Sequence, residues 1–262
     1  MQILSYNVNG IRAAIKNGLV EWLAEQAFDI LCFQEVKAHQ EQVDVSGFEA
    51  LGYQVVGWHP AEKKGYSGVA ILSRIVPDLV VDGCGLSVYD CEGRVLRADF
   101  GEITVLNCYF PSGTSGEVRQ SVKMEFLRDF QAYVHELRQT RPHLIICGDY
   151  NIAHTENDIH DPVRNKNTTG FLPEERAWMT QWFADGFTDA FRYLNPELTE
   201  YSWWSYRAGA RANNKGWRID YHSVSDSLRD RLITCRHLTT GIHSDHCGVG
   251  LEIECGPRGV NG

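Results

Sequence analysis

Short apolar runs recur along the whole chain and are separated by polar and turn-forming residues. Runs of this length, bounded by Gly, Pro, Asn and Asp, are typical of β-strands. The predicted strands are Ile3–Val8, Asp29–Glu35, Tyr53–Gly57, Gly68–Ser73, Arg94–Phe100, Ile103–Phe110, His143–Asp149, Arg218–Val224 and Gly248–Glu254. Gly101-Glu102 separates two of these runs and predicts a hairpin turn.

Helical periodicity predicts three helices, over Gly10–Gln26, Gly116–Gln139 and Pro173–Ala184. In the second helix, the apolar side chains expected on one face are Val122, Phe126, Phe130, Tyr133 and Leu137. The strands are too many and the helices too few for a doubly wound sheet, which favours two packed sheets with helices outside. The chain shows no linker or repeat, so we expect one domain over residues 1–255 and a flexible tail over 256–262.

The composition is that of a globular protein, with 262 residues of which 43% are hydrophobic. None of the eight cysteines forms a C-x-x-C pair, which favours reduced thiols over a disulfide framework. The sequence shows no signal peptide, no transit peptide and no segment fit to span a bilayer. We therefore expect a cytoplasmic protein, or a nuclear one in a eukaryote, without a membrane partner and with the monomer as the default state.

Polar side chains that chemistry can use cluster at the ends of the predicted strands. They are Asn7, Asn9, Gln34, Glu35, Asp149, Asn151, Asp220, Asp245 and His246. Taken singly, each has an ordinary structural explanation, such as a solvated strand end or a turn. The net charge of −9 does not favour a nucleic-acid partner, but acidic residues also serve as ligands for hard cations.

The ordered set of motifs is more specific than any one of them. Along the chain it reads ILSYNVNG, DILCFQEVK, GYSGVAILS, NCYFPSG, IICGDYNIAH, GFLPEERAW, YSWWSYR, GWRIDYH and HSDHC. This series resembles the exonuclease III branch of the endonuclease/exonuclease/phosphatase superfamily, whose members include apurinic/apyrimidinic endonucleases. The resemblance covers nearly the whole chain. It implies a four-layer α/β/β/α sandwich (α+β) in which two mostly antiparallel sheets are flanked by helices.

The implied activity is hydrolysis of the DNA phosphodiester bond 5′ to an abasic site, which leaves a 3′-OH and a 5′-deoxyribose phosphate. Side activities of the 3′→5′ exonuclease and 3′-phosphodiesterase kind are also implied. The implied cofactor is Mg²⁺, with Mn²⁺ as the alternative, and the implied partner is double-stranded DNA that contains abasic sites. A nucleoid-associated location in the cytoplasm follows from such a substrate.

The resemblance also assigns roles to the strand-end residues. Glu35 is the expected metal ligand, Asn7 a neighbour that binds metal or phosphate, and Asp245 a second carboxylate near the metal, directly or through water. Asp149 would orient and deprotonate the attacking water, and Asn151 would hold the phosphate or that water.

Three further residues would act on the phosphate. His246 would donate a hydrogen bond to a phosphate oxygen, and Asp220 would orient its ring and favour its protonated form. The hydroxyl group of Tyr109 would touch the phosphate, although a packed aromatic at a strand end is the plainer explanation without the family.

DNA binding by an acidic protein requires local basic stretches. Three stretches carry bases and no acids: 63–74, 162–173 and 201–219. The residues expected to contact DNA in them are Lys63, Asn165, Arg207 and Arg211. The resemblance places an apolar pocket for the base-free sugar at Trp203, Trp217 and Ile219, and a core position is the alternative for Ile219.

Two other functions stay open at this point. One is another phosphodiesterase or phosphatase of the superfamily, such as a non-specific deoxyribonuclease or a lipid phosphatase. The other is a catalytically inactive DNA-binding relative, although the catalytic residue types are all present. A Ser/His/Asp hydrolase using Ser244 lacks a nucleophile elbow and is disfavoured.

Overall fold

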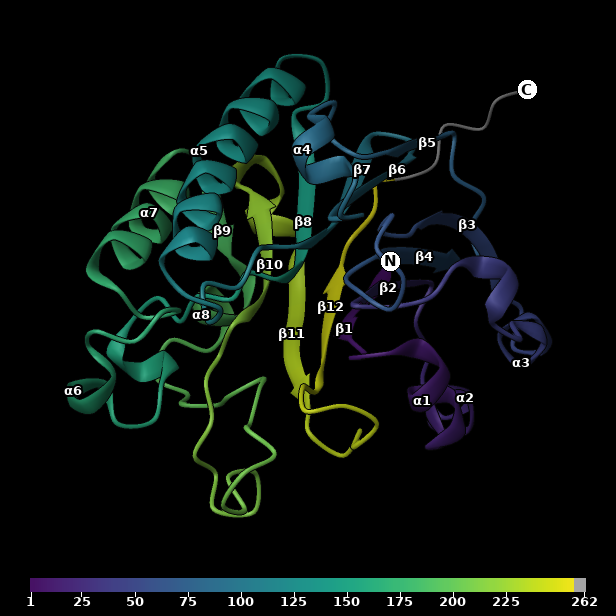
Figure 1. The fold of residues 1–262 in the computed structure, drawn as a ribbon. Coiled ribbons are helices and arrows are strands. Elements are labelled where there is room, and N and C mark those ends of the chain that lie inside the picture. Colours follow the sequence, from purple (N-terminus) through teal and green to yellow (C-terminus); the bar gives the residue numbers. More distant parts are fainter. Residues whose placement is uncertain (257–262) are drawn as a thin grey trace.

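Two six-stranded sheets form the centre of the computed structural model, which describes residues 1–256 (Figure 1). The first sheet has the order β11-β12-β1-β2-β4-β3 and the second has the order β5-β6-β7-β8-β10-β9. The strands of the first sheet are β1 (Gln2–Asn7), β2 (Ile30–Gln34), β3 (Gln54–His59), β4 (Val69–Ser73), β11 (Leu232–Leu238) and β12 (Gly248–Ile253). Those of the second are β5 (Leu79–Asp82), β6 (Val95–Phe100), β7 (Ile103–Tyr109), β8 (His143–Asp149), β9 (Phe187–Asp189) and β10 (Asp220–Ser225).

Each sheet is antiparallel except for one parallel pair, β1 with β2 and β7 with β8. A parallel pair needs a crossover, and helices supply it in both sheets. In the first sheet these are α1 (Ile11–Lys16) and α2 (Leu19–Ala24), and in the second it is the long helix α5 (Glu117–Thr140). The remaining helices are α3 (Ser46–Ala50), α4 (Ser87–Asp90), α6 (Pro162–Asn165), α7 (Pro173–Ala184) and α8 (Ala190–Leu194), with 3-10 turns at Gln40–Gln42, Glu156–Asp158 and Asp226–Arg231.

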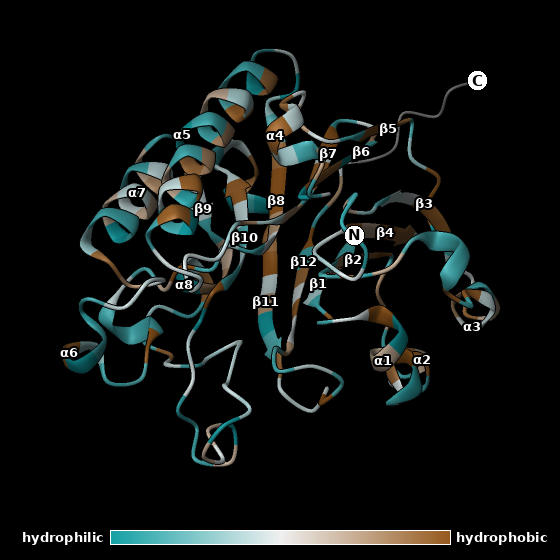
Figure 2. Cartoon of the chain, in the orientation of Figure 1, coloured by the Kyte–Doolittle hydropathy of each residue, from teal (hydrophilic) through white to brown (hydrophobic). Residues whose placement is uncertain are grey.

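Three apolar cores separate four layers. One core lies between the sheets, with side chains such as Ile71 and Ile145 from their facing sides. A second lies between the first sheet and α1–α3, and a third between the second sheet and α4, α5 and α7. Figure 2 shows the corresponding pattern, in which β8 is largely hydrophobic and the lower loops are mostly polar. The expected α/β/β/α sandwich with mostly antiparallel sheets is confirmed.

Several sequence predictions need correction. Strands β5, β9 and β11 were not predicted, and the helix expected over Gly10–Gln26 is two helices that meet at Gly18, whose φ is 89°. In α5, the predicted face is also shifted. Val122 and Tyr133 are only half-buried, whereas Lys123, Leu127 and Val134 are fully buried.

The expectation of one domain is consistent with a single pair of packed sheets. Of the predicted tail over 256–262, residues 257–262 lie outside the described part of the chain. Among the described residues, no helix combines the length and the apolar character needed to cross a membrane.

Candidate active site

The ends of neighbouring strands bring the predicted catalytic residues together. Asn7 pairs with Gln34 in the parallel β1–β2 ladder, so Glu35 comes next to it. In the second sheet, Asp149 pairs with both Tyr109 and Asp220. Glu35 and Asn151 have positive φ angles of 51° and 54°, a strained conformation that is common where a site fixes the chain.

Asn7 links carboxylates that come from the two different sheets. Its Nδ2 donates to Glu35 Oε1 at 2.9 Å and to Asp149 Oδ2 at 2.9 Å. Its Oδ1 accepts from the backbone N–H of Asn9 at 3.0 Å. Glu35 Oε2 lies 2.8 Å from Lys37 Nζ, so both carboxylate oxygens of Glu35 are oriented by neighbours.

Three of these side chains come close enough together to surround a metal ion. One ligand atom each from Glu35, Asp149 and His246 lies within 4.8 Å of the other two. The carboxylate oxygens suit a hard divalent cation. Asp245, expected as a second carboxylate near the metal, is not part of this group. Its Oδ1 accepts from Asn9 Nδ2 at 2.9 Å and its Oδ2 from Trp203 Nε1 at 3.0 Å.

Asp149 is buried and has neighbours of both signs. Its Oδ1 accepts the Asn151 backbone N–H at 2.8 Å, and its Oδ2 lies 3.3 Å from Asn151 Nδ2 and 3.8 Å from His246 Nε2. Burial raises the pKa of Asp149, and Asp220 and Glu35 add to the rise, while His246 opposes it. A carboxylate with a raised pKa is a suitable proton acceptor near neutral pH.

His246 is held by Asp220 on its far side. The distance from Nδ1 to Asp220 Oδ2 is 2.9 Å. Burial lowers the pKa of His246, but the charges of Asp220 and Asp149 outweigh burial and raise this pKa above its ordinary value. The ring is therefore an imidazolium at neutral pH, with Nε2 directed toward Asp149.

Ser202 is a partner of Asp220 that the sequence did not reveal. Its hydroxyl donates to Asp220 Oδ2 at 2.6 Å and accepts the backbone N–H groups of Ile219 and Asp220 at 3.0 and 3.1 Å. Lys37 was missed in the same way, and its place two residues after Glu35 was the only signal available for it. Asn9 was noted as a polar residue at a strand end but was given no role.

Tyr109 lies at the end of β7, 9% exposed, with its backbone oxygen bonded to Arg94 Nη1 at 2.9 Å. Burial raises the pKa of Tyr109, and the nearby carboxylates of Glu35 and Asp149 raise it further. Its hydroxyl group is therefore protonated and able to donate a hydrogen bond.

The tryptophan-rich segment forms an apolar cluster beside these groups. Ala153, Ile159, Phe171 and Ile219 are its buried members, with the half-buried Trp203 and Trp217 packed against them. The two tryptophan rings meet edge to face at 6.1 Å. The cluster adjoins the polar site because Trp203 forms a β-bridge with His246 and Ile219 precedes Asp220.

The four other predicted DNA contacts differ in whether their side chains are exposed or already bonded within the protein. Arg207 and Lys63 are exposed, and Lys63 Nζ lies 5.2 Å above the Tyr66 ring. Asn165 gives its side-chain amide to the backbone oxygens of His160 and Asp161. The guanidinium group of Arg211 donates to four backbone oxygens and stacks on a tryptophan, which makes it an anchor of its own loop.

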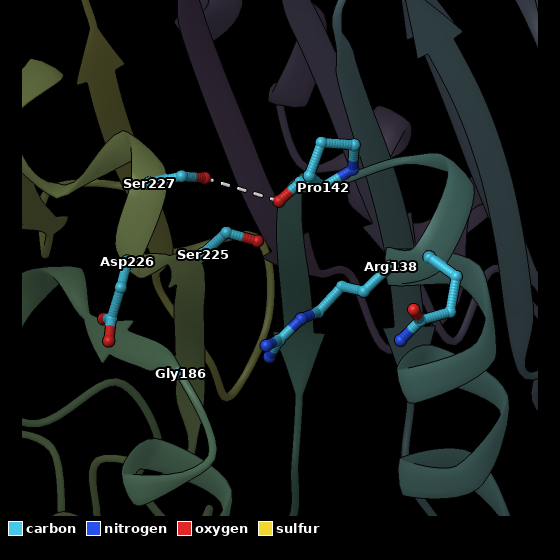
Figure 3. A pocket seen from close by; sticks show the side chains of 7 residues that line it. Arg138, Pro142, Gly186, Ser225, Asp226 and Ser227 are labelled. Atoms are coloured by element: carbon cyan, nitrogen blue, oxygen red, sulfur yellow. Dashed lines mark hydrogen bonds between the residues drawn. The ribbon is translucent and has the colours of Figure 1, made fainter.

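A pocket of about 290 Å³ lies at the opposite end of β8 and β10 (Figure 3). Ser227 Oγ donates to Pro142 O at 3.4 Å, and Arg138 Nη1 donates to Asp185 O at 2.6 Å. The polar groups around this pocket are thus engaged with the protein, and the catalytic residue types lie at the other end of the sheet.

Comparison with known proteins assigns this arrangement to a family. The Endonuclease/Exonuclease/phosphatase family matches residues 4–246. The chain belongs to this family.

An exodeoxyribonuclease of Bacillus subtilis is 42% identical over 97% of the chain and 99% of its own length. The DNA-(apurinic or apyrimidinic site) endonuclease of Dictyostelium discoideum is 36% identical over 97% of the chain and 71% of its own length. Among solved family structures, an AP endonuclease from Archaeoglobus fulgidus is 29% identical, with a TM-score of 0.88 over 97% of this chain and 100% of that one. The resemblance inferred from the motifs is confirmed.

Proposed function

We propose that the chain is a DNA base-excision-repair endonuclease that hydrolyses the phosphodiester bond 5′ to an abasic site. The observation that carries this proposal is the apolar cluster around Trp203 and Trp217, which lies directly beside the Asp149–His246 pair. A phosphodiesterase site needs no such cluster, but a site that receives a sugar without its base does. Family relatives named as AP endonucleases and exodeoxyribonucleases support it.

The proposed cofactor is Mg²⁺, with Mn²⁺ as the alternative. Glu35 would hold it, with Asn7 nearby, because the Glu35 carboxylate belongs to this cluster of ligand atoms and Asn7 Nδ2 is bonded to it. Asp245 would act near the metal through water, since Asn9 and Trp203 already bind its two oxygens. When bound, the ion neutralises phosphate charge and stabilises the departing 3′ oxygen.

Asp149 is the proposed general base. It would take a proton from a water molecule as the water oxygen bonds to phosphorus and the P–O3′ bond breaks. Asn7 Nδ2 and the backbone N–H of Asn151 fix the two oxygens of this carboxylate. The side-chain amide of Asn151, 3.3 Å from Asp149 Oδ2, would hold the phosphate or the water beside the base.

His246 and Tyr109 are the proposed phosphate contacts of this chain. The imidazolium Nε2 would donate to a non-bridging oxygen, and Asp220 keeps the ring charged and oriented. The Tyr109 hydroxyl would donate to the same phosphate. Both donors are buried beside the base, so they require no reorganisation as negative charge develops on the phosphate.

Double-stranded DNA containing abasic sites is the proposed partner of a monomeric enzyme. Trp203, Trp217 and Ile219 would line the pocket for the extruded sugar. The exposed Arg207 and Lys63 would contact the backbone, and Asn165 on α6 is the third proposed contact. The protein would act in the compartment that holds the DNA, on the nucleoid or in a nucleus.

A substrate panel tests this proposal against its two alternatives. Equal amounts of protein are assayed with Mg²⁺ on an abasic duplex, an intact duplex, a supercoiled plasmid and a phosphoinositide. Preferred cutting of the abasic duplex is expected. Faster turnover of the plasmid or the lipid would identify another phosphodiesterase or phosphatase of the family, and DNA binding without any turnover would identify an inactive relative.

A further inference from the structure

The catalytic turn at 149–151 and the wall of the apolar cluster both come against Gly170. A Cβ placed on Gly170 would lie 2.9 Å from the Trp217 ring and 3.0 Å from the backbone oxygen of Asn151. The φ of Gly170 is 91°, which also disfavours a side chain. The segment that carries Gly170 is therefore packed tightly between Asn151 and Trp217.

A buried ion pair holds both sides of this contact. Lys123 Nζ, from α5, donates to the backbone oxygen of Asn151 at 2.9 Å and to Glu175 Oε1 at 2.5 Å. Glu175 Oε2, from α7, accepts the backbone N–H groups of Gly170 at 2.7 Å and Leu172 at 2.9 Å. Both charged side chains are fully buried.

Packing α5 against α7 does not require this pair. The core beneath these helices is apolar and aromatic, and a buried ion pair adds little stability compared with apolar residues of similar size. The pair instead fixes the positions of two backbone segments, because Lys123 is bonded to Asn151 and Glu175 is bonded to Gly170. Charged hydrogen bonds of this kind are short and directional.

We propose that Lys123 and Glu175 are a positioning pair that holds the catalytic turn in register with the abasic-sugar pocket. This inference rests on the proposed function. Neither residue touches substrate. The pair acts through Asn151 on one side and through Gly170 on the other. Cutting beside an abasic site requires phosphate and sugar to be seated together, so the pair governs the rate of the chemical step more than DNA affinity.

Lys123→Met removes the donor to Asn151 and keeps the length of the side chain. With the wild type and this variant, single-turnover cleavage of a tetrahydrofuran duplex and its Kd are measured. The expected result is a rate at least about tenfold lower, with Kd changed less than about threefold, as displacement of a reacting group predicts. Lys123→Arg, which keeps a cationic donor, is expected to recover part of the rate.

Arg97→Met is the matched control, because it removes a different and largely buried ion pair, Arg97 with Asp99, in the middle of β6. It is expected to lower the melting temperature and leave the single-turnover rate of the folded protein unchanged. A wild-type rate in folded Lys123→Met would overturn the proposal. If Lys123→Met does not fold, Gly170→Ala replaces it, since its added Cβ presses on Asn151 and Trp217 while both members of the ion pair stay in place. A wild-type rate in this variant would again overturn the proposal.

Failure of the proposed function has a different signature. The wild type would then leave the tetrahydrofuran duplex intact. In that case bis-p-nitrophenyl phosphate reports on the catalytic turn alone. A lower rate in Lys123→Met would still support the proposal that Lys123 positions Asn151. An unchanged rate would refute that proposal.

Discussion

At the scale of single residues, the site depends on one amide that separates two carboxylates. Asn7 Nδ2 donates to Glu35 and to Asp149, which come from different sheets. Without that amide, two negative groups would face each other in a buried space, and one of them would take up a proton. The residue types at the strand ends were predictable from sequence. The sharing of one donor by two carboxylates was not, because it depends on how the sheets face each other.

The pH dependence of cleavage follows from Asp149 and His246. The base form of Asp149 is required, so kcat/KM should rise with pH along an acid limb that lies above the ordinary Asp pKa of about 4. The imidazolium form of His246 is also required, so activity should fall along an alkaline limb that lies above about 6.5. A pH profile of wild type and His246→Gln checks this. An alkaline limb that is unchanged in the variant would assign it to another group.

Trp217 governs substrate selectivity in this account. Trp217→Ala removes one wall of the apolar cluster and leaves Asp149 and His246 in place. Cleavage of abasic DNA should weaken, and the preference for abasic over intact duplex should fall by about tenfold or more, as loss of pocket contacts predicts. Paired assays on the two duplexes measure the ratio. A ratio equal to that of the wild type would show that Trp217 does not contribute to the pocket.

At the scale of elements, every central strand was predictable, but of the four edge strands only β3 was predicted, and β5, β9 and β11 were not. Strand β9 has three residues, and β11 alternates buried and exposed positions that include Arg236 and His237. Neither gives an apolar run. The helix predicted over Gly10–Gln26 ends early because Gly18 adopts a positive φ that an α-helix cannot continue. Lys123 illustrates the same limit, since a lysine in an amphipathic helix is normally solvated and here is buried by its partner on α7.

The segment before β10 is fixed by a buried ion network around Arg218. This guanidinium binds Asp158 at 2.7 Å and Asp189 at 2.7 Å, and all three side chains are buried or nearly so. Burial opposes the charged form of Asp158, but Arg218 outweighs it and holds the pKa of Asp158 well below its usual range. Arg218 stands between Trp217 and Ile219 in sequence, so the network anchors the backbone from which both side chains project.

Arg218→Met should lower the free energy of unfolding by about 3–5 kcal/mol, because it leaves buried carboxylates without a partner. Arg128→Met, which breaks an exposed ion pair with Asp129, is the control and should leave stability unchanged. Urea unfolding at neutral pH measures both. Equal stability of the two variants would show that the network around Arg218 is not energetically important.

At the scale of the whole molecule, two sheets with the same strand pattern place their functional strand ends together. The net charge of −9 did not reveal a DNA partner, because the acidic residues are distributed over the molecule while Arg207 and Lys63 lie exposed on loops. The order of the motifs predicted the fold, and it named most of the side chains that the structure brings together at the strand ends. Roles that depend on contacts between distant segments, such as those of Ser202, Arg211 and the Lys123–Glu175 pair, required the structure.

One histidine links the two sheets and makes stability depend on pH. His222 on β10 bonds to Val249 O on β12 at 2.9 Å, and burial lowers the pKa of His222 to about 4. In the unfolded chain His222 takes up a proton near pH 6.5, whereas in the folded chain it does so only near pH 4. The contribution of neutral His222 is thus complete above pH 6.5 and is lost as pH falls, by about 3 kcal/mol in all.

His222→Gln should reduce the loss of unfolding free energy that occurs as pH falls below about 6.5. Urea unfolding of wild type and variant at pH 7.5 and pH 4.5 measures the difference. A variant that loses as much stability as the wild type between these two values would show that other groups produce the effect.

The central claim is that Asp149 and a divalent metal cut DNA beside an abasic site. The most direct test is cleavage of a short duplex carrying one tetrahydrofuran abasic analogue, with Mg²⁺ or with EDTA, by wild type and Asp149→Asn. We predict a single metal-dependent cut on the 5′ side of the analogue, slower by about a hundredfold or more in Asp149→Asn, while the variant still binds the duplex. An intact duplex with the wild type, or a cut of equal rate by Asp149→Asn, would contradict the account.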